Sequence, residues 1–133
     1  MLFKGLDHLA IVVADTEEAL KIWRDRFGLS VLFSEFVNDD TVLLTHLDLG
    51  NTHLQLVEPL TEDHPLQDWL KTNGSGLHHL CLKVDDVGQA REAGRALGLP
   101  TGQPQPHQGT RGKRALFLDS ASTGGVPVEL TGK

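Results

Sequence analysis

The feature that most constrains the fold of this chain is an internal repeat. Residues 5–9, with the sequence Gly-Leu-Asp-His-Leu, return at 76–80 as Gly-Leu-His-His-Leu. Each copy continues with an apolar run, an aspartate and an amphipathic stretch that stops at a Gly-Leu pair. Self-similarity of this kind is the signature of one structural unit used twice. The repeat therefore predicts two related halves that pack against each other.

Each half is predicted to contain a strand, a helix and then two or three further strands. The helices are expected to begin after Asp15 and Asp86, because each aspartate is followed three residues later by a glutamate or glutamine, as in a capping box. Alternating or continuous apolar runs predict the strands, at residues 9–13, 41–49 and 52–57 in the first half and 80–84, 114–118 and 126–130 in the second.

The two halves are expected to form a single domain over residues 1–133, because half of a chain of this length would bury too little apolar surface to be stable alone. Module one covers about 1–60, a linker about 61–75 and module two about 76–133. The linker includes a short helix-like stretch around Trp69, which either packs against the sheet or contributes to a homodimer contact.

Composition limits the classes of function. The net charge of −6 argues against nucleic-acid binding, which needs clustered Lys and Arg. The longest apolar run, residues 9–14, is far shorter than the roughly 20 residues of a membrane span, so no membrane role is expected. Cys81 is the only cysteine, which excludes an intramolecular disulfide, and the N-terminus has no secretory pattern. We expect a cytoplasmic protein.

Four polar residues occupy matching places in the two halves. His8 and His79 lie in the first strand of each half, and Gln55 and Glu129 interrupt the last apolar strand of each. A two-fold relation between the halves would bring these side chains together. Two imidazoles, an amide oxygen and a carboxylate suit a divalent metal such as Zn, Co, Ni, Mn or Fe(II). The alternative is that each is an ordinary solvated strand residue.

Several segments resemble a known family. The segments are residues 7–8, 54–59, 76–80 and 122–130. They are similar to motifs of the vicinal oxygen chelate superfamily, which includes glyoxalase I and the extradiol dioxygenases, and most of all to motifs of its methylmalonyl-CoA epimerases. The resemblance implies an α+β fold in which two tandem βαβββ modules form one curved sheet around a metal-binding cleft. It also implies that the metal ligands are His8, Gln55, His79 and Glu129.

The activity that the resemblance implies is a divalent-metal-dependent epimerisation of methylmalonyl-CoA. Abstraction of a proton would give an enolate that the metal stabilises, with one Co, Zn, Ni or Mn ion as cofactor. Glu129 is a candidate for one acid/base group. Leu44 stands where some epimerases carry a further carboxylate, so His46 and Asp119 are the candidates for the second.

A coenzyme A thioester also needs contacts for its phosphates. The only strongly basic stretch is residues 107–114, in which Arg111 and Lys113 stand beside Gly109 and Gly112. Glycines let the backbone approach a ligand while the charged side chains meet phosphate oxygens. The alternative is a solvated hairpin loop whose charges bind nothing specific.

Two other functions stay open at this point. The first is a glyoxalase I-like lyase or isomerase, or another metalloenzyme of the superfamily, which would use the same four ligands. The second is a metal-free protein of the same fold that sequesters a small molecule. An Fe(II) dioxygenase is disfavoured, because its two-histidine, one-carboxylate site would leave Gln55 without a role.

Overall fold

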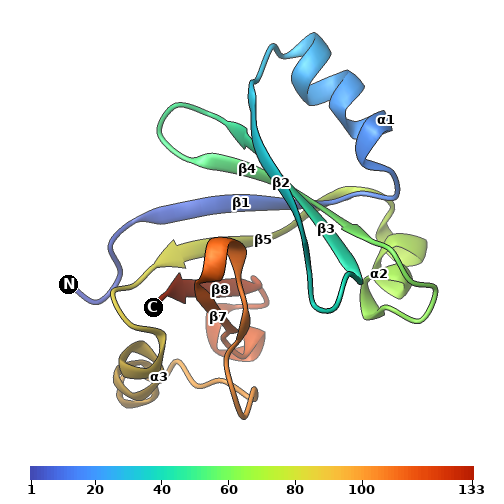
Figure 1. Cartoon of the computed structure of the whole chain (residues 1–133). Helices are drawn as coiled ribbons and strands as arrows, with labels where there is room; N and C mark the ends of the chain where they lie inside the picture. The colour runs from blue at the N-terminus through green and yellow to red at the C-terminus, as the bar shows by residue number, and fades with distance from the viewer. The chain divides into compact units, whose positions relative to one another are not determined.

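The computed structural model describes residues 1–133, and its elements follow the repeated order predicted from the sequence (Figure 1). The first copy consists of one strand, one helix and three strands: β1 (Leu6–Val12), α1 (Thr16–Leu20) with a π-helical continuation (Lys21–Arg26), β2 (Val31–Val37), β3 (Val42–Asp48) and β4 (His53–Pro59). The second copy has the same order: β5 (Gly76–Lys83), α3 (Val87–Ala96), β6 (His107–Gln108), β7 (Arg114–Phe117) and β8 (Val128–Gly132). The predicted α+β class with two βαβββ modules is confirmed.

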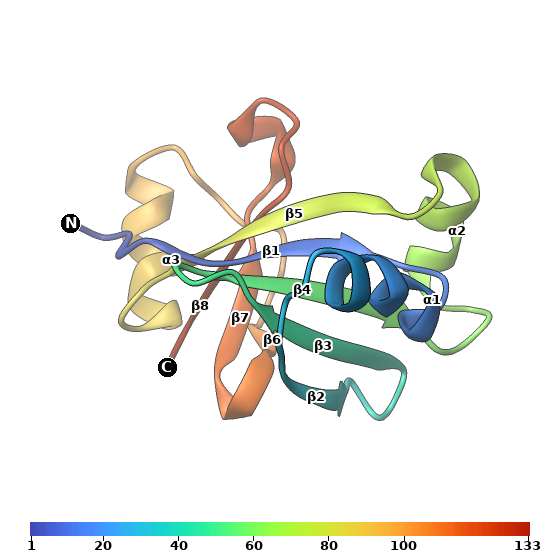
Figure 2. The ribbon, with the colours of Figure 1, turned by 90° about the horizontal axis from the view of Figure 1, so that it is seen from above.

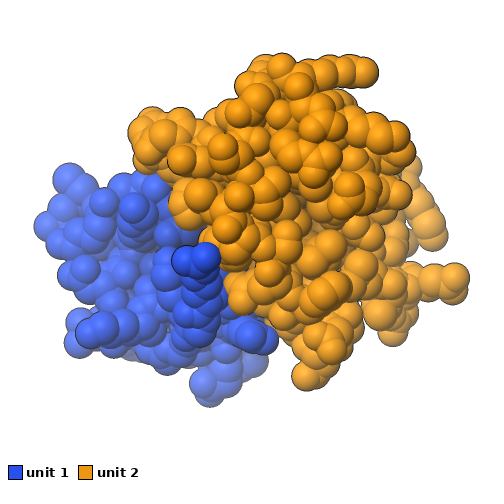
Figure 3. All heavy atoms as spheres, turned by 45° about the horizontal axis from the view of Figure 1, so that its top comes forward, with its two compact units in different colours: residues 1–8, 79–133 blue, residues 9–78 orange.

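The remaining elements lie between these strands and helices. The helix-like stretch of the linker is α2 (Pro65–Asn73), and short 3-10 turns occupy Thr110–Gly112 and Ser120–Thr123. None of the helices has the length and hydropathy needed to span a bilayer. The chain divides into two compact units (Figure 3): unit 1 contains residues 1–8 and 79–133, and unit 2 contains residues 9–78.

In unit 2 the strands follow the order β2-β3-β4-β1, and β2, β3 and β4 pair antiparallel. Alternation along β1 sends its apolar residues to both faces. Ile11 packs with Leu20 of α1, which lies against β4 (Figure 2), whereas Ala10 and Val12 pack in a second cluster that includes Trp69 of α2. Of the two alternatives for Trp69, the structure therefore supports packing against the sheet.

In unit 1 the strands follow the order β5-β8-β7-β6. β5 and β8 run parallel, and β7 pairs antiparallel with β8 and β6. α3 covers one face of these strands, where Val87 and Ala90 pack with Leu116 and Leu130. Glu129 points to the opposite face of β8, because neighbouring residues of a strand point to opposite sides of the sheet.

The predicted helix caps are confirmed. The side chain of Asp15 accepts a hydrogen bond from the backbone N–H of Glu18 at 3.2 Å, and that of Asp86 accepts one from Gln89 at 2.9 Å. Each cap fixes the residue at which the helix leaves its strand. The two modules therefore begin in the same way in sequence and in structure.

Two strands were not predicted individually. β2 lacks a clear alternating pattern because three of its apolar residues are well exposed: Val31 at 40%, Leu32 at 43% and Phe36 at 58%. β6 has only two residues, too few for any periodicity. β1 also begins at Leu6, before the apolar run that predicted it, so that Asp7 lies within the strand beside His8.

Candidate metal centre

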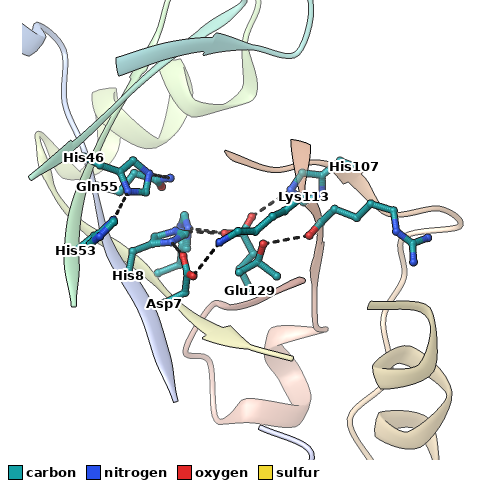
Figure 4. Close-up of polar contacts among 11 residues, drawn as sticks. Asp7, His8, His46, His53, Gln55, His107, Lys113 and Glu129 are labelled. Carbon is teal, nitrogen blue, oxygen red and sulfur yellow. Dashed lines mark hydrogen bonds and ion pairs between the residues drawn. The ribbon is translucent and has the colours of Figure 1, made fainter. Parts of the chain in front are cut away.

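Three of the four predicted ligands lie together in unit 1. His8 comes from β1, His79 from β5 and Glu129 from β8. Figure 4 labels His8 and Glu129. Oε1 of Glu129 is 3.4 Å from Nε2 of His8 and 3.3 Å from Nε2 of His79, and the three ligand atoms lie within 4.8 Å of one another. Tetrahedral coordination at about 2.1 Å separates ligand atoms by about 3.4 Å. The three atoms therefore fit a small divalent ion.

The strand register explains why Glu129 faces this centre. Glu129 is the register partner of Cys81 on β5 and of Phe117 on β7, and its neighbour Leu130 points into the apolar cluster beneath α3. His79 precedes Cys81 by two positions, so both point to the same face of β5 as Glu129 does on β8. The carboxylate is thus fixed by strand pairing, with an exposed fraction of only 8%.

Asp7 orients His8. Its Oδ2 atom is 2.8 Å from Nδ1 of His8, and its Oδ1 atom is 3.4 Å from Nζ of Lys113 (Figure 4). Burial acts to raise the pKa of Asp7, but the hydrogen bond and charge of His8 and the charge of Lys113 lower it to about 2. The ionised carboxylate holds the Nδ1–H of His8, which leaves Nε2 directed at the centre, as carboxylates do behind metal-bound histidines.

The charge state of the cluster favours an ionised Glu129. Burial acts to raise the pKa of Glu129, but the hydrogen bond with His107 and the close approach of His79 and His8 hold it well below its usual range. Burial acts to lower the pKa of His8, but its contacts with Asp7 and Glu129 raise it. A buried carboxylate stabilised in its charged form is the state that a divalent cation requires.

Cys81 lies close to the same group, and its Sγ atom forms a second possible ligand set with Asp7 and His8. Burial, followed by the charges of Glu129 and Asp7, raises the pKa of the Cys81 thiol. A thiol binds metal only as the thiolate. The donors of His8, His79 and Glu129 are nitrogen and oxygen, which suit the predicted Co, Zn, Ni or Mn better than a soft ion.

The fourth predicted ligand, Gln55, and the predicted acid/base residue His46 lie in unit 2. They are register partners on β4 and β3, and Nε2 of Gln55 is 3.0 Å from Nε2 of His46. Nδ1 of His46 is 3.0 Å from Nδ1 of His53. Exposed fractions of 4% for Gln55 and 1% for His46 show that both are buried. Their part in the centre stays a prediction.

The remaining candidate residues have defined contacts. Arg111 lies in the turn before β7 with a left-handed φ of 53°, and Lys113 contacts Asp7. Asp119 accepts a hydrogen bond from the backbone N–H of Gly102 at 2.7 Å, which gives it a structural role in a loop. Leu44, which replaces the carboxylate of some epimerases, is buried in the second apolar cluster of unit 2.

Sequence reasoning missed two residues of the centre. Asp7 was noted only within the repeated and family-like segments and was given no role, although an acid directly before a strand histidine is a usable signal for a supported ligand. His107 lies 3.1 Å from Oε2 of Glu129 through its Nε2 atom, and no pattern in the sequence connects the two residues. It reaches Glu129 because the two-residue strand β6 pairs with β7, which pairs with β8.

Comparisons with known proteins agree with the family that the sequence resembles. Residues 7–117 match the family model of the Glyoxalase/Bleomycin resistance protein/Dioxygenase superfamily. The mitochondrial methylmalonyl-CoA epimerase of Dictyostelium discoideum is 36% identical, over 96% of this chain and 78% of that protein. The ethylmalonyl-CoA/methylmalonyl-CoA epimerase of Cereibacter sphaeroides is 35% identical, over 94% of this chain and 95% of that protein.

A solved structure extends the likeness to the fold. A variant of the Streptomyces coelicolor methylmalonyl-CoA epimerase, in complex with 2-nitronate-propionyl-CoA, superposes with a TM-score of 0.87 at 30% identity and covers 98% of each chain. The βαβββ modules, the superfamily match and these relatives lead to one assignment. The chain belongs to the Glyoxalase/Bleomycin resistance protein/Dioxygenase superfamily and, within it, is an isomerase of the methylmalonyl-CoA epimerase family.

Proposed function

We propose that this chain is a divalent-metal-dependent epimerase that interconverts the stereoisomers of methylmalonyl-CoA. The observation that carries the proposal is the contact of His8 and His79 with one oxygen of Glu129, at 3.4 and 3.3 Å. Relatives named for this reaction, and a related structure in complex with a propionyl-CoA derivative, support the acyl-CoA substrate.

We propose that one Co, Zn, Ni or Mn ion is held by His8, His79 and Glu129, with Gln55 as the fourth ligand. When bound, such an ion stabilises the negative charge that develops on substrate oxygen atoms as the C2 proton leaves. The protein's own contribution is to hold the ligand atoms in place: Asp7 orients His8, and strand pairing orients Glu129.

Glu129 is proposed as one of the two groups that move the C2 proton. An ionised carboxylate offers lone pairs that can accept a proton, and that of Glu129 lies beside His8 and His79. Epimerisation also needs a group that delivers a proton to the opposite face of C2, because removal and return on one face would regenerate the starting isomer.

His46 is proposed as that second group, and a variant tests it. The His46→Phe variant should lose about 100-fold or more in epimerisation, while C2 proton exchange of one stereoisomer survives through Glu129. Exchange and epimerisation are measured together by NMR in deuterium oxide. Phe33→Leu is the control, because Phe33 stacks on the His46 ring at 4.5 Å and its loss disturbs packing alone. Equal loss of exchange for both isomers would contradict this role.

Arg111 and Lys113 are proposed to contact the phosphates of coenzyme A. The Arg111→Ala variant should raise KM for the acyl-CoA roughly tenfold with kcat unchanged, because one charge-assisted hydrogen bond to phosphate is lost. Arg111 is the cleaner test, since Lys113 also contacts Asp7. The control is Arg95→Ala, which removes an exposed arginine that pairs only with nearby Glu92. An unchanged KM would indicate that Arg111 does not contact the substrate and that the loop is only solvated.

The direct test of the proposal offers the metal-loaded protein two substrates. We expect the protein to convert one stereoisomer of methylmalonyl-CoA into a mixture of both. A coupled assay that is specific for one isomer measures this conversion. Turnover of a hemithioacetal in its place would identify a glyoxalase I-like enzyme. Tight binding of a small molecule without turnover or metal would identify a sequestering protein.

A further inference from the structure

The second oxygen of Glu129 has a partner that the proposed reaction does not use. Oε2 lies 3.1 Å from Nε2 of His107, whereas Oε1 faces the two ligand histidines (Figure 4). Behind His107, its Nδ1 atom lies 3.3 Å from Nε2 of Gln103, and Oε1 of Gln103 accepts the backbone N–H of Phe117 at 2.6 Å. We call this series of contacts the Gln103–His107 chain. All of its members belong to unit 1.

The direction of every hydrogen bond in the Gln103–His107 chain follows from one backbone group. The N–H of Phe117 can only donate, so Gln103 must turn its amide oxygen toward it. The amide NH2 of Gln103 then faces His107 and donates to Nδ1, which must be the acceptor. A neutral imidazole that accepts at Nδ1 carries its proton on Nε2. Nε2–H of His107 therefore donates to Oε2 of Glu129.

The far end of the Gln103–His107 chain is anchored to β7. Thr101 donates its hydroxyl to the carbonyl of Phe117 at 2.6 Å and accepts the backbone N–H of Gln103 at 3.1 Å. The ring of His107 also stacks on that of Phe117, with centroids 5.7 Å apart and planes 14° from parallel. Since Phe117 is the register partner of Glu129, the chain begins and ends on neighbouring strands.

A carboxylate that is not held can rotate about its last bond and offer a metal either oxygen or both. Once Oε2 is bound by His107, rotation would break that hydrogen bond inside a site where Glu129 is 8% exposed. A broken hydrogen bond to a buried charged group is costly. Only Oε1 then remains directed at His8 and His79.

We propose that Gln103 and His107 are positioning residues that hold Glu129 as a one-oxygen ligand of the metal. The inference rests on the proposed metal centre, but not on its substrate. It deepens the proposed function by assigning a role to a histidine of β6 and a glutamine of the preceding loop, neither of which belongs to the ligand set.

The experiment compares Co2+ binding by His107→Leu and His107→Gln with that of the wild-type protein. Leucine removes the donor, whereas a glutamine amide places an N–H near the position of Nε2. We expect His107→Leu to bind Co2+ about 10- to 100-fold more weakly and to change its visible absorption spectrum, as loss of an outer-shell partner does. His107→Gln should recover most of the affinity and the wild-type spectrum.

Two further variants complete the test. Gln103→Leu leaves His107 in place and should weaken Co2+ binding in the same direction, which keeps the proposal testable if His107→Leu does not fold. Gln108→Leu, on the same strand, is the control and should bind Co2+ as the wild type does. Wild-type affinity and spectrum in both His107→Leu and Gln103→Leu would overturn the inference alone. Absence of Co2+ binding by the wild-type protein would overturn the metal centre and the inference together.

Discussion

The Glu129→Gln variant is expected to lose at least about 100-fold in epimerisation of methylmalonyl-CoA at saturating metal. The neutral amide has the size of the carboxylate but cannot accept the C2 proton, and it brings no charge to the histidines that surround it. His8, His79 and His107 all contact this one side chain, so the substitution changes the contacts of all three histidines. The initial rate is measured on one stereoisomer, with metal content determined on the same sample.

Glu58→Gln is the matched control for this variant. Glu58 ends β4 in unit 2, and its Oε1 atom accepts from the backbone N–H of Thr16 at 2.8 Å and from the Thr16 hydroxyl at 2.7 Å. An amide oxygen can accept both bonds, so the expected cost is about 1 kcal/mol of stability with activity retained. Loss of activity in both variants alike, or in neither, would remove Glu129 from the proposed mechanism.

The His79→Ala variant is expected to lose stoichiometric metal. An outer-shell partner contributes about 10- to 100-fold to affinity, so loss of a ligand should cost at least 100-fold. Of the three proposed ligands in unit 1, only His8 and Glu129 would remain. Affinity for Zn2+ is measured by competition with a chromophoric chelator, and metal content by elemental analysis after dialysis.

His78→Ala is the control, because it removes the neighbouring histidine. The His78 ring contacts Trp69 of α2, with centroids 5.2 Å apart, and alternation along β5 directs His78 to the opposite face from His79. We expect this variant to keep its metal and to lose only packing energy. Equal metal loss from both variants would point to a general disturbance of β5 and would contradict the assignment of His79 as a ligand.

The repeat and strand alternation were sufficient to predict most of the fold and that three of the four polar residues lie together. His8 and Glu129 both interrupt otherwise apolar strands, and burial of such residues requires partners. Because the polar residues occupy matching positions in two copies of one unit, we expected them to be partners of one another. The contact of His8, His79 and Glu129 agrees with that reasoning.

What could not be predicted depends on irregular backbone. Gln103 lies in a loop and His107 on a two-residue strand, where no periodicity links them to Glu129. Their placement follows from hydrogen bonds of the loop to Phe117, which only the folded chain reveals. The exposed strand β2 escaped individual prediction for a related reason, because a strand that buries little apolar surface shows no clear alternation.

The measurement that tests the account most directly follows solvent deuterium into C2 of methylmalonyl-CoA, with protein stripped of metal and then reloaded with Co2+. We expect no exchange by the stripped wild-type protein, exchange of both stereoisomers after reloading, and loss of the exchange of one stereoisomer in reloaded Glu129→Gln. Absence of exchange above the buffer blank, in wild-type protein that holds one Co2+ per chain, would contradict the proposed reaction.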